Sequence, residues 1–329
     1  MWFWLSLIAL LCWSGSDLFS KIGCRDASDK YSHLKMVMAV GVVMGLHAAI
    51  EIFIGGTEIN LSILLTYLPV SLLYIGSMTL GYLGLRYIEL SISSPICNSS
   101  GALVAVLTLL FVGSEDYSPL ALFAVALVCV GAIGLGVVDA CEDEELRAQR
   151  QELGNYKYAK SWIALALPVA YCVLDAAGTF ADNRVLEILK RTVEDYEGSA
   201  NVAYELTFLV AGILSFIYVV LIKKDKLIPK MEAPKYTGAI FETAGQFAYI
   251  YAIADTEHLA MSAPIIAAYC AASVLWSRLF LKEKLSWNHY AMIGPGGDRY
   301  RHHGCIRHVN RLIWEYSRAP SQKRRGPAV

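Results

Sequence analysis

The sequence predicts an all-α, polytopic membrane protein made of two related halves. The 329 residues are 56% hydrophobic and only 17% charged, with a mean hydropathy of +0.46, whereas about a quarter of the residues in a soluble domain are charged. The apolar residues gather in blocks long enough to cross a bilayer, which takes about 20 residues in a helix. Parts of the first half of the chain also recur in the second.

Nine apolar stretches are evident, five in the first half and four in the second. They cover residues 2–22, 36–54, 63–85, 91–112, 119–139, 161–180, 202–222, 237–254 and 260–281. We expect each to be a helix, because backbone N–H and C=O groups in lipid must be paired within their own segment. The first stretch has no basic region before it, so we interpret it as a membrane helix and not as a cleaved signal peptide.

The repeat is clearest in two connecting segments, residues 82–96 and 251–265. Five positions match at one constant offset: Tyr82, Leu90, Ser93, Pro95 and Ile96 fall on Tyr251, Leu259, Ser262, Pro264 and Ile265. A second offset matches Trp4 and Asp17 to Trp162 and Asp175. Internal repeats in a polytopic membrane protein are typical of transporters that hold their substrate near the repeat interface.

Polar segments divide the chain into repeats. The longest, residues 141–160, is highly charged, and we expect it to link a first repeat over 1–140 to a second repeat over 161–294. A similar acidic insert is expected at 181–201.

The final segment, residues 295–329, is too polar to span a bilayer. It contains eight Lys or Arg, three His and only two acidic residues, whereas the tenth apolar stretch begins near Trp287 and stops at Gly294. Moving the reading frame by one base from Gly297 would encode mostly Val, Ala, Ile and Thr. We therefore hypothesise that a frameshift near codon 295 replaced the tenth helix. The alternative is a genuine basic tail on a nine-helix protein.

Three motifs stand out along the chain. They are WSGSDLFSKIG at 13–23, LRYIELSISSPI at 85–96 and APIIAAYCAASVLWSRLFLKEKLSWNHY at 263–290. Together they resemble the drug/metabolite transporter superfamily, EamA type, and the LKEKLS run at 281–286 is the most specific part. The resemblance covers residues 1–294. It implies ten helices in two inverted five-helix repeats, a central cavity open alternately to each side, and the export or import of amino acids, metabolites or drugs.

The orientation in the membrane stays open. Lys and Arg in short loops mark the cytoplasmic side, and here they gather after the first, fifth and seventh apolar stretches. This pattern places the N-terminus outside. The resemblance implies instead that both termini are cytoplasmic.

A few ionisable side chains fall inside the apolar stretches. A charge in the membrane interior is costly and usually faces a cavity or a partner. Glu242, Gln246 and Tyr249 are spaced so that they share one helix face, which would suit a polar or cationic substrate, or a proton on Glu242. The alternative is a polar contact between packed helices.

Asp17 and Asp175 occupy matching positions in the two halves, and Tyr171 lies one turn before Asp175. We expect these residues to flank a substrate site at the repeat interface. An ion pair between Asp17 and Lys21, four residues further on, is the alternative for Asp17.

His47 and Glu51 share a face of the second apolar stretch. They are candidates for gating or coupling, or they pair with each other. Glu205 lies near the start of the seventh stretch, where it either takes part in transport or simply lies at the interface. A last group is expected to line the central cavity: Asn98, Tyr269 and Ser273.

These features favour a secondary transporter that moves small metabolites, amino acids or drugs across the cell membrane by alternating access. No HExxH, GxxxxGK[ST] or GxSxG motif occurs, so neither enzyme chemistry nor direct ATP hydrolysis is expected. We also expect no cofactor and no metal, since the eight cysteines form no CxxC cluster, and the net charge of −1 argues against a nucleic-acid partner. The expected partners are a small-molecule substrate and the lipid bilayer, and a homodimer stays open. The alternatives are a non-transporting scaffold or sensor, and an inactive frameshifted transporter.

Overall fold

The computed structural model of the chain describes residues 1–26, 28–101, 103–104, 162–253, 265–266 and 268–283, with isolated residues at 123, 126, 130–131 and 134. The regular elements in these ranges are all helical, without a strand. Five spans are long and apolar enough to cross a membrane. They are α1 (Trp2–Cys24), α2 (Ser32–Ile50) with the π-helical turn η1 (Glu51–Gly55), α3 (Leu61–Gly84), α9 (Trp162–Leu189), and α10 (Tyr196–Phe216) with the π-helical turn η3 (Ile217–Ile222).

Three further helices complete the described part. They are α4 (Leu90–Cys97), α11 (Pro229–Ile253), and α13 (Tyr269–Trp276) with the π-helical turn η4 (Ser277–Leu281). α11 is 25 residues long but less apolar than the five spans, because it carries Glu242 and Gln246. The predicted fifth stretch lies almost wholly outside the described residues. The 141–160 linker, the start of a tenth helix and the 295–329 tail lie entirely outside them.

The second half differs from the predicted boundaries. α9 continues to Leu189 and α10 begins at Tyr196, so the acidic insert predicted at 181–201 is mostly helical. The Asp195 side chain accepts a hydrogen bond from the N–H of Gly198 (3.1 Å), and such a cap satisfies a free donor at the helix start. The predicted boundaries differ because hydropathy detects only the apolar part of a helix. The end of α9 and the start of α10 are helical but polar.

The helices run between two ends of the bundle. We call these the Asp29 end, where α1 stops and α2 begins, and the Glu58 end, where α2 stops and α3 begins. α3 returns to the Asp29 end. There the Lys21 ammonium donates to the carbonyls of Leu85 (2.8 Å) and Ile88 (2.9 Å), just after α3.

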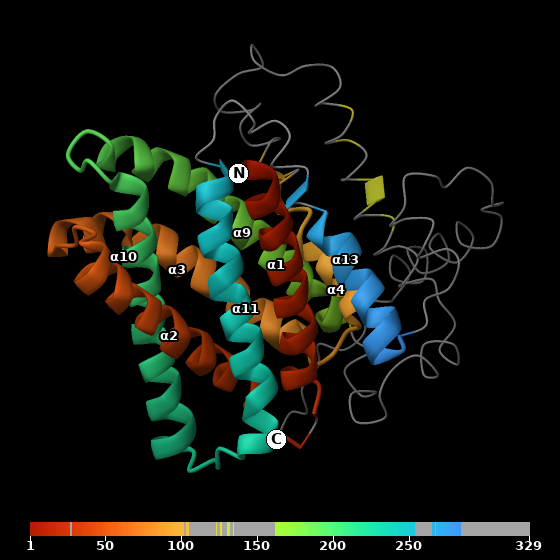
Figure 1. Ribbon diagram of the computed structural model, residues 1–329. Helices are drawn as coiled ribbons and strands as arrows, with labels where there is room; N and C mark the ends of the chain where they lie inside the picture. The colour runs from red at the N-terminus through yellow and green to blue at the C-terminus, as the bar shows by residue number, and fades with distance from the viewer. Residues whose placement is uncertain are drawn as a thin grey trace, which may run out of the picture.

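The helices α9, α10 and α11 each run in the direction opposite to α1, α2 and α3, respectively. α9 begins beside the end of α3, where Gly84 faces Leu167. α10 begins at the Glu58 end, where the Ser199 hydroxyl donates to the Glu58 carbonyl (2.6 Å). α11 begins at the Asp29 end, where Lys235 pairs with Asp29. α1 and α9 therefore run in opposite directions, as do α2 and α10, and α3 and α11 (Figure 1).

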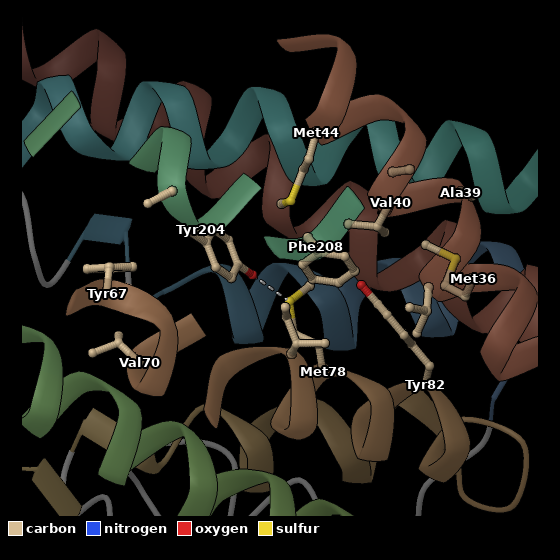
Figure 2. Close-up of a cluster of buried hydrophobic side chains, with 14 of the residues drawn as sticks. Met36, Ala39, Val40, Met44, Tyr67, Val70, Met78, Tyr82, Tyr204 and Phe208 are labelled. Carbon is tan, nitrogen blue, oxygen red and sulfur yellow. Dashed lines mark hydrogen bonds between the residues drawn. The ribbon is translucent and has the colours of Figure 1, made fainter. Parts of the chain in front are cut away.

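The helices pack mainly across the two halves of the chain. α1 packs along α11, α2 along α10 and α3 along α9, while α4 and α13 contact each other (Figure 1). The main core lies where α2, α3 and α10 meet. Figure 2 shows Phe208 of α10 among side chains of α2 and α3, with the Tyr204 hydroxyl bonded to the Met78 sulfur (3.1 Å).

Glycine allows the closest approach of α2 and α10. A Cβ atom built on Gly41 would lie 2.6 Å from the Phe208 carbonyl oxygen and 3.0 Å from the Cα of Gly212. These neighbours are backbone atoms, which cannot move aside without moving the helix. Small residues at such crossings are typical of membrane helices, because association there depends on close packing.

We expect Gly41→Ala to destabilise the fold by about 1–3 kcal/mol, the usual cost of overpacking. The free energy of unfolding, measured by denaturant titration in mixed micelles, checks this. Gly101→Ala is the matched control, because a Cβ there would meet nothing within 4 Å. Equal stability of the two variants would contradict the close contact.

Candidate functional site

Asp17 of α1 joins three helices from both halves of the chain. Its Oδ2 atom accepts hydrogen bonds from the Ser94 hydroxyl of α4 (2.6 Å) and the Ser273 hydroxyl of α13 (2.7 Å). The short distances are those of hydroxyl donors to a carboxylate. The predicted alternative, an ion pair with Lys21, is not formed, because the Lys21 ammonium donates to the carbonyls of Leu85 and Ile88.

Glu283 positions α4 for this contact. Its carboxylate follows η4 and accepts from the N–H groups of Leu90 and Ser91 (both 3.0 Å) and from the Ser91 hydroxyl (2.7 Å). The first N–H groups of a helix have no partner within it, and a negative charge there suits the helix dipole. The LKEKLS run of the second half therefore caps the helix that carries Ser94.

Tyr269 extends the hydrogen-bond network from α13 to the end of α4. Its hydroxyl donates to Oδ1 of Asn98. The Asn98 amide donates in turn to the Ser94 carbonyl (2.8 Å) and hydroxyl (3.1 Å). The three residues expected to line a cavity, Asn98, Tyr269 and Ser273, thus gather around Asp17.

Two more carboxylates face the same region. Glu242 of α11 lies close to Ser16 of α1 and within electrostatic range of Asp17 and Asp175. Asp175 of α9 is hydrogen-bonded to Ser100. Three acids from three helices therefore share the interior, and the charged groups that act on Glu242 are both acidic.

Aromatic rings lie beside the acids. The Trp13 ring is 5.1 Å from that of Tyr249 and 5.5 Å from that of Tyr269, between centroids. Trp13 rests on Gly245 of α11, where a Cβ would lie 2.6 Å from the indole. Only glycine leaves room for the indole at this point of α11.

Tyr171 of α9 contacts α3 in the way that Trp13 of α1 contacts α11. It rests on Gly81, where a Cβ would lie 2.8 Å from the phenol ring. Tyr171 is also within electrostatic range of Asp175, Tyr269 and Glu242. The structure thus brings the two predicted acids of the repeat, and Tyr171, to one place.

The six predicted substrate residues are only partly shielded from solvent. All have intermediate exposure: Asp17, Tyr171, Asp175, Glu242, Gln246 and Tyr269. The contacts above connect five of them. Gln246 lies one turn beyond Glu242 on α11, on the same side of the helix. Partial accessibility inside a bundle is what a binding site for a small solute requires.

His47 and Glu51 belong to a separate polar group near the end of α2. The His47 Nε2 atom is 3.8 Å from Glu51, and its Nδ1 atom is 2.9 Å from Glu205 of α10. The Glu205 side chain is only 1% exposed and also accepts from Asn201 (3.2 Å). Glu205 is therefore buried between helices and paired with His47 of α2. Its partner His47 is distant in the sequence, so no local spacing marks the pair.

A buried ion-pair network lies at the Asp29 end. Asp29 pairs with Lys35 of α2 and Lys235 of α11, both at 3.0 Å. Glu232 lies 3.7 Å from Lys35 and 3.3 Å from Lys235. The Arg86 guanidinium donates to the Asp29 carbonyl. Lys35 and Lys235 contributed to the sequence pattern of basic loops, but here they are buried and paired, so packing accounts for their position.

Sequence analysis did not assign a site role to Ser94 or Tyr82. Both lie in the repeated segment 82–96, whose recurrence was the available signal. Arg86 lies in the same segment but is not one of its matched positions. Asp29 lies outside the segment and carries no such signal, since a charged residue in a loop is usually exposed.

No protein-family model matches the chain, and no curated protein is significantly similar to it. The residues themselves thus carry the chemical interpretation of the site. Within the described ranges, no group of three His, Cys, Asp or Glu side chains is arranged to hold a metal ion. The arrangement of three carboxylates, serine hydroxyls and aromatic rings is suited to binding positive charge.

Proposed function

We propose that this protein is a secondary transporter of small solutes, such as metabolites, amino acids or drugs, across the cell membrane. One observation carries the proposal: Asp17, Asp175 and Glu242, from three helices of both halves, share the interior of a helical bundle. Such residues are costly in a membrane protein and usually serve a transport pathway.

The packing of the helices supports two inverted repeats. In the proposed repeat, α1, α2, α3 and α4 correspond to α9, α10, α11 and α13. The contact of α1 with α11 corresponds to that of α9 with α3. The contact of α11 with α2 corresponds to that of α3 with α10, and the contact of α13 with α1 to that of α4 with α9. The corresponding long helices also run in opposite directions, as inverted repeats require.

Contacts between individual residues also match when each helix is replaced by its counterpart in the other half. Trp13 rests on Gly245 and Tyr171 on Gly81, while Ser20 lies against Gly238 and Tyr74 against Gly178. Positions 13 and 20 differ from 171 and 178 by 158 residues, the offset that also relates Asp17 to Asp175. Positions 74 and 81 differ from 238 and 245 by 164 residues. Two constant offsets therefore relate both pairs of contacts, which supports a common ancestral unit.

Alternating access would use the two ends of the bundle. The Asp29 network joins α2, α11 and the loop after α1, so it holds that end closed. His47, Glu51 and Glu205 join α2 to α10, and we assign them to gating or coupling. The resemblance to EamA-type transporters is a further support, carried by the motifs at 13–23, 85–96 and 263–290.

Uptake into liposomes tests this function. The full chain, and in parallel a frame-restored version, would be reconstituted and screened with amino acids, nucleosides and organic cations, with and without a pH gradient. We expect saturable uptake of one solute class, reduced in Asp175→Asn by about tenfold or more, since loss of a charged contact commonly costs 1.5–3 kcal/mol.

Glu187→Gln is the matched control on the same helix, because the Glu187 side chain is 69% exposed. Uptake that is lost equally in both variants would reflect damage to α9 and contradict the site. The absence of uptake of any solute by either version of the chain would contradict the transporter.

A further inference from the structure

We propose that the substrate carries a positive charge, as an ammonium group attached to an apolar or aromatic body. This inference rests on the proposed function, since it names the substrate class of the same site. Three features carry it: the sign of the charges, a buried tyrosine hydroxyl without a hydrogen-bond partner among the described residues, and the aromatic rings.

The charged side chains that face the site are acidic throughout the described part of the chain. Glu242 interacts with two other acids, and Asp17 accepts only from serine hydroxyls. The lysines nearest along the same helices are engaged elsewhere: Lys21 with carbonyls after α3, and Lys235 with Asp29. Carboxylates that share the interior of a helical bundle without a cation are costly, so protons or a bound cation must neutralise them.

Tyr82 of α3 is an independent indication of a ligand. Its side chain is 6% exposed, and its hydroxyl has no hydrogen-bond partner among the described residues. Glu242 and Asp17 both lie within electrostatic range of this hydroxyl. Buried hydroxyls are nearly always paired. An ammonium group bound to Glu242 would supply the donor that the Tyr82 oxygen lacks.

The rings define the rest of the substrate. Trp13, Tyr249 and Tyr269 form a cluster beside the acids, with Trp13 at its centre. The faces of Trp and Tyr attract cations, and organic ammonium ligands are often bound in this way. The same rings offer apolar contact to the remainder of the molecule.

The charges disfavour other substrates. An anion would meet three carboxylates and no cation in the part of the chain that is described. A zwitterion would place its own carboxylate in the same environment. A neutral solute would leave protons alone to neutralise the acids.

Binding of three matched probes tests the inference. They are 2-phenylethylamine, 2-phenylethanol and phenylacetate, which share one aromatic body and differ in charge. Titration calorimetry would use the purified full chain in nanodiscs, with empty nanodiscs as background. We expect the amine to bind at least about tenfold more tightly than the alcohol, a difference of about 1.4 kcal/mol, and phenylacetate not to bind.

Two variants locate the effect. Glu242→Gln is expected to remove the preference for the amine. Tyr82→Phe is expected to weaken amine binding several-fold without lowering thermal stability, because its hydroxyl has no hydrogen-bond partner to lose among the described residues. A Tyr82→Phe variant that is less stable but binds the amine as before would contradict the assigned role. Equal or tighter binding of the alcohol or phenylacetate would overturn the inference.

The two proposals fail separately. Binding of the amine without any uptake into liposomes would refute the transporter and leave the cation site. Uptake of a neutral or anionic solute that the amine does not inhibit would leave the transporter and refute the cationic substrate.

Discussion

Asp17→Asn is expected to keep the helical packing and to lower substrate uptake on the order of 100-fold, because loss of one partner of a buried charged contact costs about 2–5 kcal/mol. The amide oxygen of asparagine can still accept from Ser94 and Ser273, so the link between α1, α4 and α13 survives. Only the negative charge is lost. The substitution therefore separates a role in packing from a role in transport.

Initial uptake rate and thermal stability would be measured together for this variant. Asp17→Leu is the companion variant, because it cannot accept from either serine and should also lower stability. If Asp17→Asn transports at the normal rate while Asp17→Leu is unstable, Asp17 serves only to hold the three helices together, and the substrate site does not include it.

Asp29→Asn is expected to destabilise the bundle by about 3–5 kcal/mol, the usual effect of leaving a buried charge without its partner. Asp29 is the shared counter-ion of Lys35 and Lys235, whose side chains are 4% and 0% exposed. Without it, the Lys235 ammonium depends on Glu232 at 3.3 Å, and the Lys35 ammonium on Asp225 at 3.2 Å and Glu232 at 3.7 Å. The free energy of unfolding in mixed micelles measures the effect.

Asp26→Asn is the control in the same loop. Asp26 is exposed, and hydrogen bonds from Ser28 lower the pKa of its carboxyl group, so this control also removes a negative charge at neutral pH. We expect a change within about 1 kcal/mol for a surface charge. Equal effects of the two substitutions would show that the Asp29 network is not a buried structural element.

Local patterns in the sequence predicted the helices. Hydropathy over about 20 residues located α1, α2 and α3 to within a few residues, because an apolar run of this length has few other stable structures. It misplaced the starts of α10 and α11 and the end of α9, since helix ends outside the apolar region carry polar residues. It also gave no information on the partner of each helix.

The candidate site was predicted in part. The matching offset of Asp17 and Asp175 and the spacing of Glu242 and Gln246 identified polar residues inside apolar stretches. The contacts of Asp17 with Ser94 and Ser273 were not predictable, because residues 17, 94 and 273 lie far apart along the chain. The pair of His47 and Glu205 is similar. Spacing reveals neighbours within one helix, whereas contacts between helices depend on which helices pack together.

The sequence by itself determined that the chain is helical, that its helices have membrane length, and which few polar residues lie within them. Only the tertiary structure decided which of these residues meet, that Lys21 turns to α3 and not to Asp17, and that Lys35 and Lys235 are buried. The physical reason is that hydropathy and helical periodicity act over neighbouring residues. The meeting of distant helices is set instead by close packing at glycines such as Gly41, Gly81 and Gly245.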